Sequence, residues 1–338
     1  MEKKRLGDIC EIVTGATPKT NIKEFWDGDI NWITPAELTE DTYIINESLR
    51  KITTEGVEKT GLKSFPKGTV ILSSRAPIGK VAIAGYEMYC NQGFKNLICS
   101  KQINNRFLYW YLKGHKEYLN SLGRGATFKE ISKEIVENIE ICLPTLEKQE
   151  KYADILEQCN GIIQIKKGQL RKLETLVKSR SAEMFGNPRT NSKGFQTKKG
   201  SDLFKISNGK AVPNNHRFKT GISAYGGNGI SWYTDNVLYE HDTIVIGRVG
   251  FQSGNVHLVK GPVWVTDNAM YISDFLDDSL SLFFLCEMME QIDFTKYQDA
   301  GDLKKVTQKP FMDMDYIVPS KKLQQQFSDF VVSTDKSK

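Results

Sequence analysis

The sequence predicts an α+β protein in which two similar lobes, each of mixed or antiparallel β-sheet with helices, are joined by a long α-helix. The central stretch 146–185 contains no proline and carries apolar residues at helical spacing. The segments before and after it share an order of sequence features, and both contain short β-branched runs of strand length. We expect the long helix to form an antiparallel coiled coil. The predicted divisions are a first lobe at 1–145, the helix at 146–186, a second lobe at 187–318 and a second, shorter helix at 319–338.

The central stretch is bracketed by Pro144 and Pro188, so nothing inside it forbids one continuous helix. At about 1.5 Å per residue such a helix is about 60 Å long, which exceeds an ordinary globular helix. The alternative is two ordinary helices broken near Gly161 or Gly168. The predicted helix-packing interface is one apolar stripe with spacings of three and four, which consists of Ile155, Cys159, Ile162, Leu170, Leu173 and Val177.

Charge along this stretch is polarised. Acidic residues predominate in 146–160, and basic residues predominate in 161–180. An antiparallel helix of similar polarity would match acid to base. The alternative is a solvated face without a chosen partner.

Composition is that of an ordinary soluble globular chain. The 338 residues suggest two domains, and the net charge of +5 is compatible with nucleic acid without establishing it. No apolar run is long enough to span a membrane, and the N-terminus lacks the apolar core of a signal peptide. The six cysteines form no CxxC pair, so we interpret them as reduced core thiols of a cytoplasmic protein.

Strand-like runs in the first lobe fall at 68–75 and 79–84. Residues 104–121 have the pattern of an aromatic-rich helix packed on a sheet. The lobe ends with the run 139–143 before Pro144.

The second lobe repeats this order. Residues 202–209 echo 8–15, 242–248 echo 68–75, and 282–285 echo 107–110. From Gly125 onward the register is constant at 175 residues, so that Pro144 matches Pro319 and Gln149 matches Gln324. A shared order that closes in constant register indicates duplication of a unit made of one lobe and one helix. The second helix, from Lys321, is shorter than the first, as a natural or engineered truncation would make it.

Several motifs in this order resemble the specificity subunit of type I restriction–modification systems. They are Leu6-Gly7-Asp8-Ile9, Ser73 to Gly79, Asn91-Gln92-Gly93-Phe94, Leu143-Pro144 with Glu147-Lys148-Gln149, Ala224 to Ile230, Arg248-Val249-Gly250, and Pro319 with Leu323 to Gln326. The resemblance covers nearly the whole chain and rests on the order of the motifs.

The resemblance implies a non-catalytic chain that recognises double-stranded DNA. Each lobe would read one half of a split site, and the helices would hold the lobes apart and bind modification (methyltransferase) subunits. Restriction (endonuclease and translocase) subunits would join the complex. S-adenosylmethionine, ATP and Mg would belong to those partners, with no cofactor or metal in this chain. The short second helix departs from the family pattern and leaves open a truncated, half-type form that acts as a homodimer through the long helix.

Phosphates are bound by Lys, Arg or backbone N–H groups, and base edges by forked donors and amides. Loops between the predicted strands supply such groups, although any one of them is as well explained as a solvated side chain. Arg75 and Arg248 stand out at the ends of matching strands, with an internal salt bridge as the alternative for each. The predicted DNA-binding residues are Thr17, Lys19, Arg75, Lys80, Gln92, Lys95, Arg124, Thr127, Lys129, Lys210, Asn214, Arg217, Tyr225, Asn228, Arg248, Gln252, Lys304 and Lys305.

Enzyme signatures are missing from the sequence. It has no phosphate-binding loop, no amino-methyltransferase motif, no nucleophile elbow and no metal-ligand spacing among its four histidines. A nuclease or methyltransferase with an unusual site is the alternative from another class. A two-lobed scaffold that binds protein and not DNA is the third.

Overall fold

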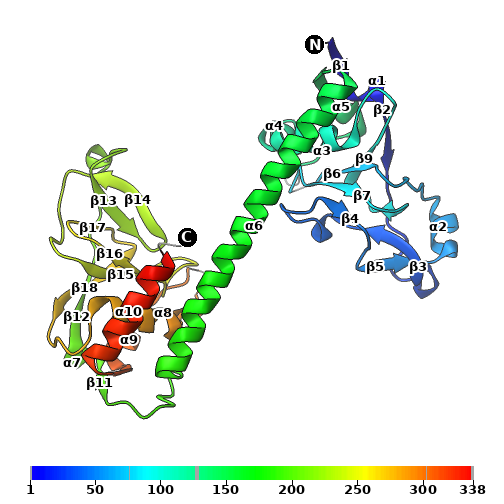
Figure 1. Ribbon diagram of the computed structural model, residues 1–338. Coiled ribbons are helices and arrows are strands. Elements are labelled where there is room, and N and C mark those ends of the chain that lie inside the picture. The colour runs from blue at the N-terminus through cyan, green and yellow to red at the C-terminus, as the bar shows by residue number, and fades with distance from the viewer. Residues whose placement is uncertain (1, 76, 126–128, 302, 336–338) are drawn as a thin grey trace. The chain divides into compact units, whose positions relative to one another are not determined.

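The computed structural model describes residues 2–75, 77–125, 129–301 and 303–335, and it divides into two compact units at Ile165/Lys166. The long helix α6 (Leu146–Phe185) is continuous through Gly161 and Gly168 (Figure 1). The prediction of one helix is therefore confirmed, and the alternative of two broken helices is wrong. The first half of α6 belongs to the first unit and its second half to the second unit. We call the residues before α6 lobe 1 and those after it lobe 2.

Lobe 1 is built on a five-stranded mixed sheet of order β2-β9-β6-β7-β4, with a three-stranded sheet β5-β3-β8 and the pair β1-β10. Only the pairs β4–β7 and β3–β8 are parallel among these described strands. The strands are β1 (Glu2–Arg5), β2 (Cys10–Thr14), β3 (Trp26–Ile33), β4 (Ile44–Ile45), β5 (Arg50–Ile52), β6 (Val70–Ser73), β7 (Val81–Ala84), β8 (Tyr89–Cys90), β9 (Phe94–Cys99) and β10 (Glu140–Leu143). The helices are α1 (Leu6–Ile9), η1 (Lys23–Phe25), η2 (Pro35–Glu37), α2 (Thr54–Thr60), α3 (Asn105–Gly114), α4 (Lys116–Ser121) and α5 (Lys133–Glu137).

Lobe 2 has the sheet β12-β18-β15-β16, the sheet β14-β13-β17 and the pair β11-β19. The strands are β11 (Thr197–Lys199), β12 (Phe204–Asn208), β13 (Ile222–Gly226), β14 (Gly229–Thr234), β15 (Thr243–Gly247), β16 (Val256–Val259), β17 (Trp264–Val265), β18 (Ala269–Phe275) and β19 (Asp315–Ile317). The helices are α7 (Gly200–Leu203), η3 (Asn214–His216), α8 (Leu282–Ile292), η4 (Phe294–Tyr297), α9 (Lys309–Asp313) and α10 (Lys321–Asp335).

The two lobes share one topology, which confirms the predicted duplication. In each, four strands pair in the same order, so that β2-β9-β6-β7 matches β12-β18-β15-β16. The strand before each long helix pairs antiparallel with the first strand of its own lobe. The sequence prediction was inexact at 104–121, where the structure has two helices, α3 and α4, that meet at His115.

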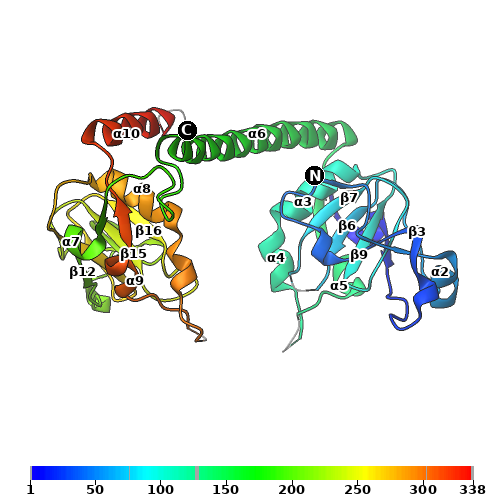
Figure 2. The ribbon, with the colours of Figure 1, turned by 90° about the horizontal axis from the view of Figure 1, so that it is seen from below.

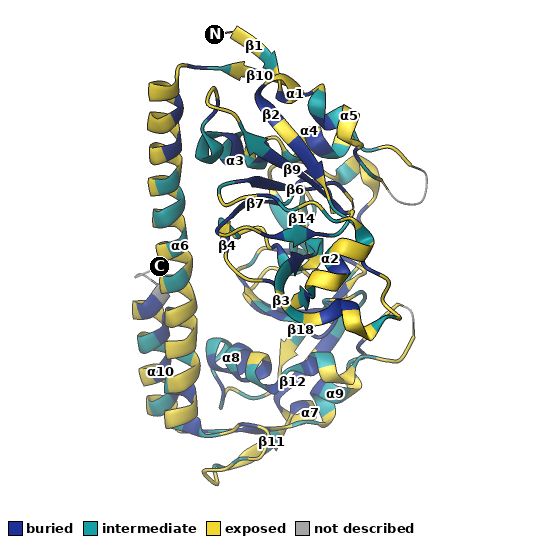
Figure 3. Ribbon diagram, turned by 90° about the vertical axis from the view of Figure 1, so that its right-hand side faces the viewer, coloured by how far each residue is buried: buried dark blue, intermediate teal, exposed yellow. Residues whose placement is uncertain are grey.

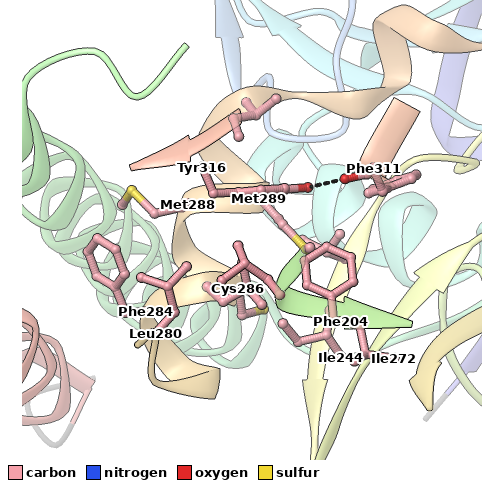
Figure 4. Packing of buried hydrophobic residues seen from close by; sticks show 14 of the residues in the cluster. Phe204, Ile244, Ile272, Leu280, Phe284, Cys286, Met288, Met289, Phe311 and Tyr316 are labelled. Carbon is pink, nitrogen blue, oxygen red and sulfur yellow. Dashed lines mark hydrogen bonds between the residues drawn. The ribbon is translucent and has the colours of Figure 1, made fainter. Parts of the chain in front are cut away.

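The core of lobe 2 includes the end of α6. Phe204, Ile244 and Phe311 pack between the sheet and its helices, where the Tyr316 hydroxyl donates to the Phe311 carbonyl at 3.2 Å (Figure 4). Phe185 at the end of α6 joins this core and meets Phe327 of α10, with ring centroids 5.3 Å apart. Burial of these aromatic faces fixes the pairing of the two helices.

Helix α10 runs antiparallel beside the end of α6 (Figures 1 and 2). Val177 and Phe330 pack on the lobe 2 core, and the Arg180 guanidinium lies 5.9 Å from the Phe330 ring. Farther from this end, α6 is mostly exposed (Figure 3). Helix pairing in the described chain therefore covers only the last turns of α6.

The cysteines are free thiols, and the expectation of buried thiols holds for Cys10, Cys90 and Cys286. It is wrong for Cys142 and Cys159, which are exposed because β10 and α6 turn them away from the cores. Of the helices that the structure describes, none is long and apolar enough to cross a membrane.

Candidate nucleic-acid interface

Candidate residues of lobe 1 gather at one edge of the five-stranded sheet. Strand register places Thr14 opposite Lys95 and Ser73 opposite Phe94, so the loops that leave β2 and β6 meet the loop that enters β9. The hydroxyl of Thr17 donates to Oε1 of Gln92 at 2.6 Å across two of these loops. The sheet thus brings together polar groups that lie far apart in the sequence.

Glu130 organises the cationic groups of this edge. Its Oε1 accepts from Nζ of Lys95 at 3.3 Å, and its Oε2 accepts from Nε of Arg75 at 2.9 Å. Nζ of Lys95 also donates to Ser74 at 3.1 Å. The Lys95 side chain is only 7% exposed, whereas that of Arg75 is 46% exposed. The internal salt bridge left open for Arg75 is therefore present, with part of its guanidinium still accessible, while Lys95 supports the loop from inside.

The remaining lobe 1 candidates differ in how free they are. Nζ of Lys80 donates to the carbonyls of Leu38 at 2.6 Å and Pro35 at 3.3 Å, which fixes the η2 segment against the sheet edge. Lys19, Arg124 and Lys129 are exposed. The candidate Thr127 lies outside the described residues.

Lobe 2 presents an equivalent edge built from the ends of β12 and β15 and the start of β18. A guanidinium nitrogen of Arg248 donates to the Asp267 carbonyl at 3.2 Å, and the Gly250 N–H donates to the Lys304 carbonyl at 2.8 Å. The turn between β13 and β14 reaches the same place, because a Cβ added to Gly227 would lie 3.2 Å from Cα of Gly247. The candidates that converge here from three segments are Tyr225, Asn228, Arg248, Gln252, Lys304 and Lys305.

Three other lobe 2 candidates are engaged locally or flank this edge. Lys210 is exposed, and its carbonyl accepts from the Trp264 indole at 2.8 Å. The guanidinium of Arg217 donates to the Val212 carbonyl and lies 4.2 Å from the Trp232 ring. Asn214 begins η3 and is exposed.

Arg75 and Arg248 are not equivalent, and that part of the sequence prediction is off by one residue. Arg75 forms a bridge with Glu130, whereas its counterpart Val249 forms one with Lys305. The N–H of Ile131 donates to the carbonyl of Ser74 just as the N–H of Val306 donates to that of Arg248. Arg248 therefore matches Ser74. Ser74 and Arg248 each directly follow the last residue of β6 or β15, and Arg75 comes one residue later.

Equivalent positions in the two lobes carry different chemistry. Strand pairing matches Lys95 of β9 with Met270 of β18. Lys95 lies opposite Leu72, the last residue but one of β6, and Met270 lies opposite Ile246, the last residue but one of β15. The position of Glu130 is taken by Lys305. Glu130 was not predicted because a carboxylate does not bind phosphate, although its match to Lys305 in the other copy is visible in the sequence.

The helix-packing stripe is exposed in the first half of α6. Ile155, Cys159 and Ile162 face solvent, as does Leu170, while Leu173 is half-buried. An added Cβ at Gly161 or Gly168 would meet no described atom within 4 Å, so the described chain contains no close backbone neighbour there. The stripe remains a predicted interface.

The start of α6 is tied to lobe 1 by charge. Nε of Arg106 donates to Glu157 at 2.6 Å, and a terminal nitrogen donates to Asp154 at 2.5 Å. The Arg106 hydrogen bond lowers the pKa of Glu157. Tyr43 also donates to Glu157, and burial, the largest cause, raises the pKa of Tyr43 to about 12.

Among the described residues, no group of three or more His, Cys, Asp or Glu is placed to hold a metal ion. Two polar sheet edges and one long helix define a two-lobed binding protein. A sequence model described as "Type I restriction modification DNA specificity domain" matches residues 1–175 and 192–338. The chain belongs to this family.

Relatives agree with this assignment. The MjaIX specificity subunit of a type I restriction enzyme from Methanocaldococcus jannaschii is 37% identical over 232 residues, which are 62% of this chain and 53% of that protein. The EcoprrI specificity subunit of Escherichia coli is 24% identical over 297 residues, or 79% of this chain and 71% of that protein. The first match thus spans about half the length of the relative.

Solved structures share the fold. The S subunit of a type I restriction-modification system from M. genitalium superposes with a TM-score of 0.61 at 16% identity, covering 99% of this chain and 89% of that one. A chain from a study of complex assembly and conformational transition of the type I R-M system has a TM-score of 0.52 at 15% identity, covering 99% and 90%.

Proposed function

We propose that this chain is the non-catalytic DNA specificity subunit of a type I restriction–modification complex, and that each lobe reads one half of a bipartite site. The observation that carries the proposal is one scaffold used twice with different chemistry at equivalent positions. Lys95 and Glu130 in lobe 1 stand where Met270 and Lys305 stand in lobe 2. Two lobes that share one fold but differ in their surface residues suit two half-sites of different sequence.

The residues at each edge suit duplex DNA. Exposed cations such as Lys129 and Lys305 match phosphates, whereas forked or amide groups such as Arg248 and Gln92 match base edges. Phosphate contacts make affinity fall steeply with salt, so this proposal predicts strong salt dependence. A scaffold that binds only protein would show little salt dependence in any DNA binding. A cytoplasmic location follows, because the DNA substrate lies there.

The exposed stripe of α6 supports the proposal that methyltransferase subunits dock on the helix. Ile162 is 61% exposed and Ile163 is 52% exposed, which is a large apolar area to leave in water. Restriction subunits would join through that complex. S-adenosylmethionine, ATP and Mg would act in those partners. The partners would carry out the methylation and cleavage, and we assign no catalytic residue to this chain.

A homodimer through α6 is a second candidate, favoured by the same stripe. The chain has a mass of 38.4 kDa, so light scattering separates a monomer from a dimer. The paired variant Ile162→Glu and Ile163→Glu should abolish self-association if α6 is the dimer contact. If the free chain is monomeric and the variant loses only methyltransferase binding, the homodimer is excluded.

The experiment that tests the function is selection from randomised duplexes by the chain assembled with its methyltransferase subunits. We expect recovery of two short sequence blocks separated by an unread spacer. Absence of any enriched sequence would contradict the proposal. Salt titration of the recovered duplex then separates phosphate contacts from base reading.

A further inference from the structure

Phe251 lies in the turn between β15 and β16, at the cationic edge of lobe 2, and its side chain is 87% exposed. A lone exposed apolar residue is ordinary on a protein surface. What distinguishes Phe251 is that its backbone is held firmly while the ring packs on little of the lobe.

Four hydrogen bonds fix the backbone of this turn. Nε2 of Gln298 donates to the carbonyls of Phe251 at 3.2 Å and Ser253 at 2.8 Å. The Gly250 N–H donates to the Lys304 carbonyl at 2.8 Å, and the Ser253 N–H donates to the Gly250 carbonyl at 3.0 Å. Gly250 has a φ of 95°, a conformation that a side chain at this position would disfavour. The ring is therefore carried on a preorganised support.

The surroundings of Phe251 suit duplex DNA better than a protein surface. Arg248 precedes the turn, and the bonded loop brings Lys304 and Lys305 to it. Leu303, which is 56% exposed, is a large apolar side chain on that loop. An aromatic ring beside cations suits a base step flanked by phosphates, because the cations would meet the backbone while the ring meets the bases.

We propose that Phe251 is a wedge that inserts at one base step of the half-site read by lobe 2 and partly unstacks it. This inference rests on the proposed function and names a specificity-determining residue for it. Insertion costs least at flexible pyrimidine–purine steps. Lobe 2 would thereby gain preference for such a step without any hydrogen bond from the ring.

The test uses the full chain assembled with methyltransferase subunits and the duplex selected above, with 2-aminopurine placed at successive steps of each half-site. We expect the wild-type complex to raise 2-aminopurine fluorescence at one step of one half-site. Phe251→Ala should remove that signal and weaken binding about ten-fold, and Phe251→Trp should keep both. Thermal unfolding of Phe251→Ala should match that of the wild type, since the ring is exposed.

The matched control is Phe275→Ala, at the opposite end of β18 from the cationic edge. It should bind within about two-fold of wild type and keep the fluorescence signal. The inference is overturned if no step brightens with the wild type, or if Phe251→Ala retains either the signal or the affinity. If the wild-type complex selects no sequence, the proposed function itself fails, which is a separate outcome.

Discussion

Gln149 and Gln324 make the same three hydrogen bonds in the two halves of the chain. Nε2 of Gln149 donates to the carbonyls of Pro144 at 2.9 Å and Gln102 at 3.1 Å, and its Oε1 accepts from the N–H of Asn104 at 2.8 Å. Nε2 of Gln324 donates to the carbonyls of Pro319 at 2.9 Å and Ser279 at 2.8 Å, and its Oε1 accepts from the N–H of Ser281 at 2.9 Å.

These glutamines join each helix to its lobe. Asn104 and Ser281 are the N-caps of α3 and α8, so each amide ties the start of a lobe helix to the start of α6 or α10. Both side chains are buried, and every bond goes to a backbone group. The duplicated unit is thus a lobe locked to the first turn of its own helix.

Replacement of either glutamine by alanine should destabilise its own unit by about 1–3 kcal/mol, because buried backbone groups lose their partners. Hydrogen exchange resolves the two units, and Gln324→Ala should speed exchange around α8 and α10 alone. The adjacent Gln325→Ala is the control. Its amide bonds Asp329 on the exposed surface at 2.8 Å, so the change should cost less than about 0.5 kcal/mol. Equal effects of Gln324→Ala and Gln325→Ala would contradict this account.

The pairing of Lys95 with Glu130 yields a second prediction. Glu130→Gln should cost about 1–2 kcal/mol, a value reduced from that of a fully buried pair because Glu130 is 35% exposed. Adding Lys95→Met should recover most of the loss, because the buried charge then disappears and lobe 2 already carries Met270 at this position. Urea unfolding of the single and double variants measures both steps. A double variant less stable than Glu130→Gln would show that Lys95 is not the source of the cost.

The contact between Arg106 and Glu157 predicts a pH dependence in the attachment of α6. Arg106 lowers the folded-state pKa of Glu157. The stability that the Arg106–Glu157 contact contributes is therefore fully present above the ordinary pKa of 4.5, and it is lost as the pH falls through the lower folded-state pKa. Exchange protection of the first turns of α6 should therefore decrease in acid in the wild type. The variant Glu157→Gln should have lower protection at neutral pH and a smaller decrease. Parallel pH profiles of the two proteins would rule out this role for Glu157.

Lobe-specific reading predicts that a change at one edge alters one half-site only. Arg248→Ala should relax specificity or reduce affinity by about five- to one-hundred-fold at the half-site of lobe 2, as expected for loss of a base contact. Lys205→Ala serves as its control, because Lys205 pairs with Asp274 near the opposite end of β18. Fluorescence anisotropy with duplexes altered in either half measures the effect. Loss of discrimination at both halves would argue against separate readers.

Much of the architecture could be predicted because duplication and a long helix each produce a recognisable sequence pattern. The constant register from Gln149 to Gln324 is visible because these helix starts must make identical buried hydrogen bonds. The continuity of α6 follows from the absence of proline between Pro144 and Pro188. The family resemblance, which rests on the same ordered motifs, is confirmed by the match over both halves of the chain.

The candidate site was harder to predict, because loop residues lack a period. The match of Arg248 to Ser74, and not to Arg75, is resolved only by the backbone pairing of each segment with 130–131 or 305–306. The burial of Lys95 follows from its place on β9 beside Glu130, which comes from a distant segment. The DNA contacts of the individual candidates stay predictions.

The central claim is that each lobe reads its own half-site. It is tested most directly by selecting duplexes with the wild-type complex, with the Arg248→Ala complex and with the Arg75→Ala complex. The account predicts a bipartite site for the wild type, with the lobe 2 variant degrading one block and the lobe 1 variant degrading the other. Selection of a single undivided sequence, or degradation of the same block by both variants, would contradict it.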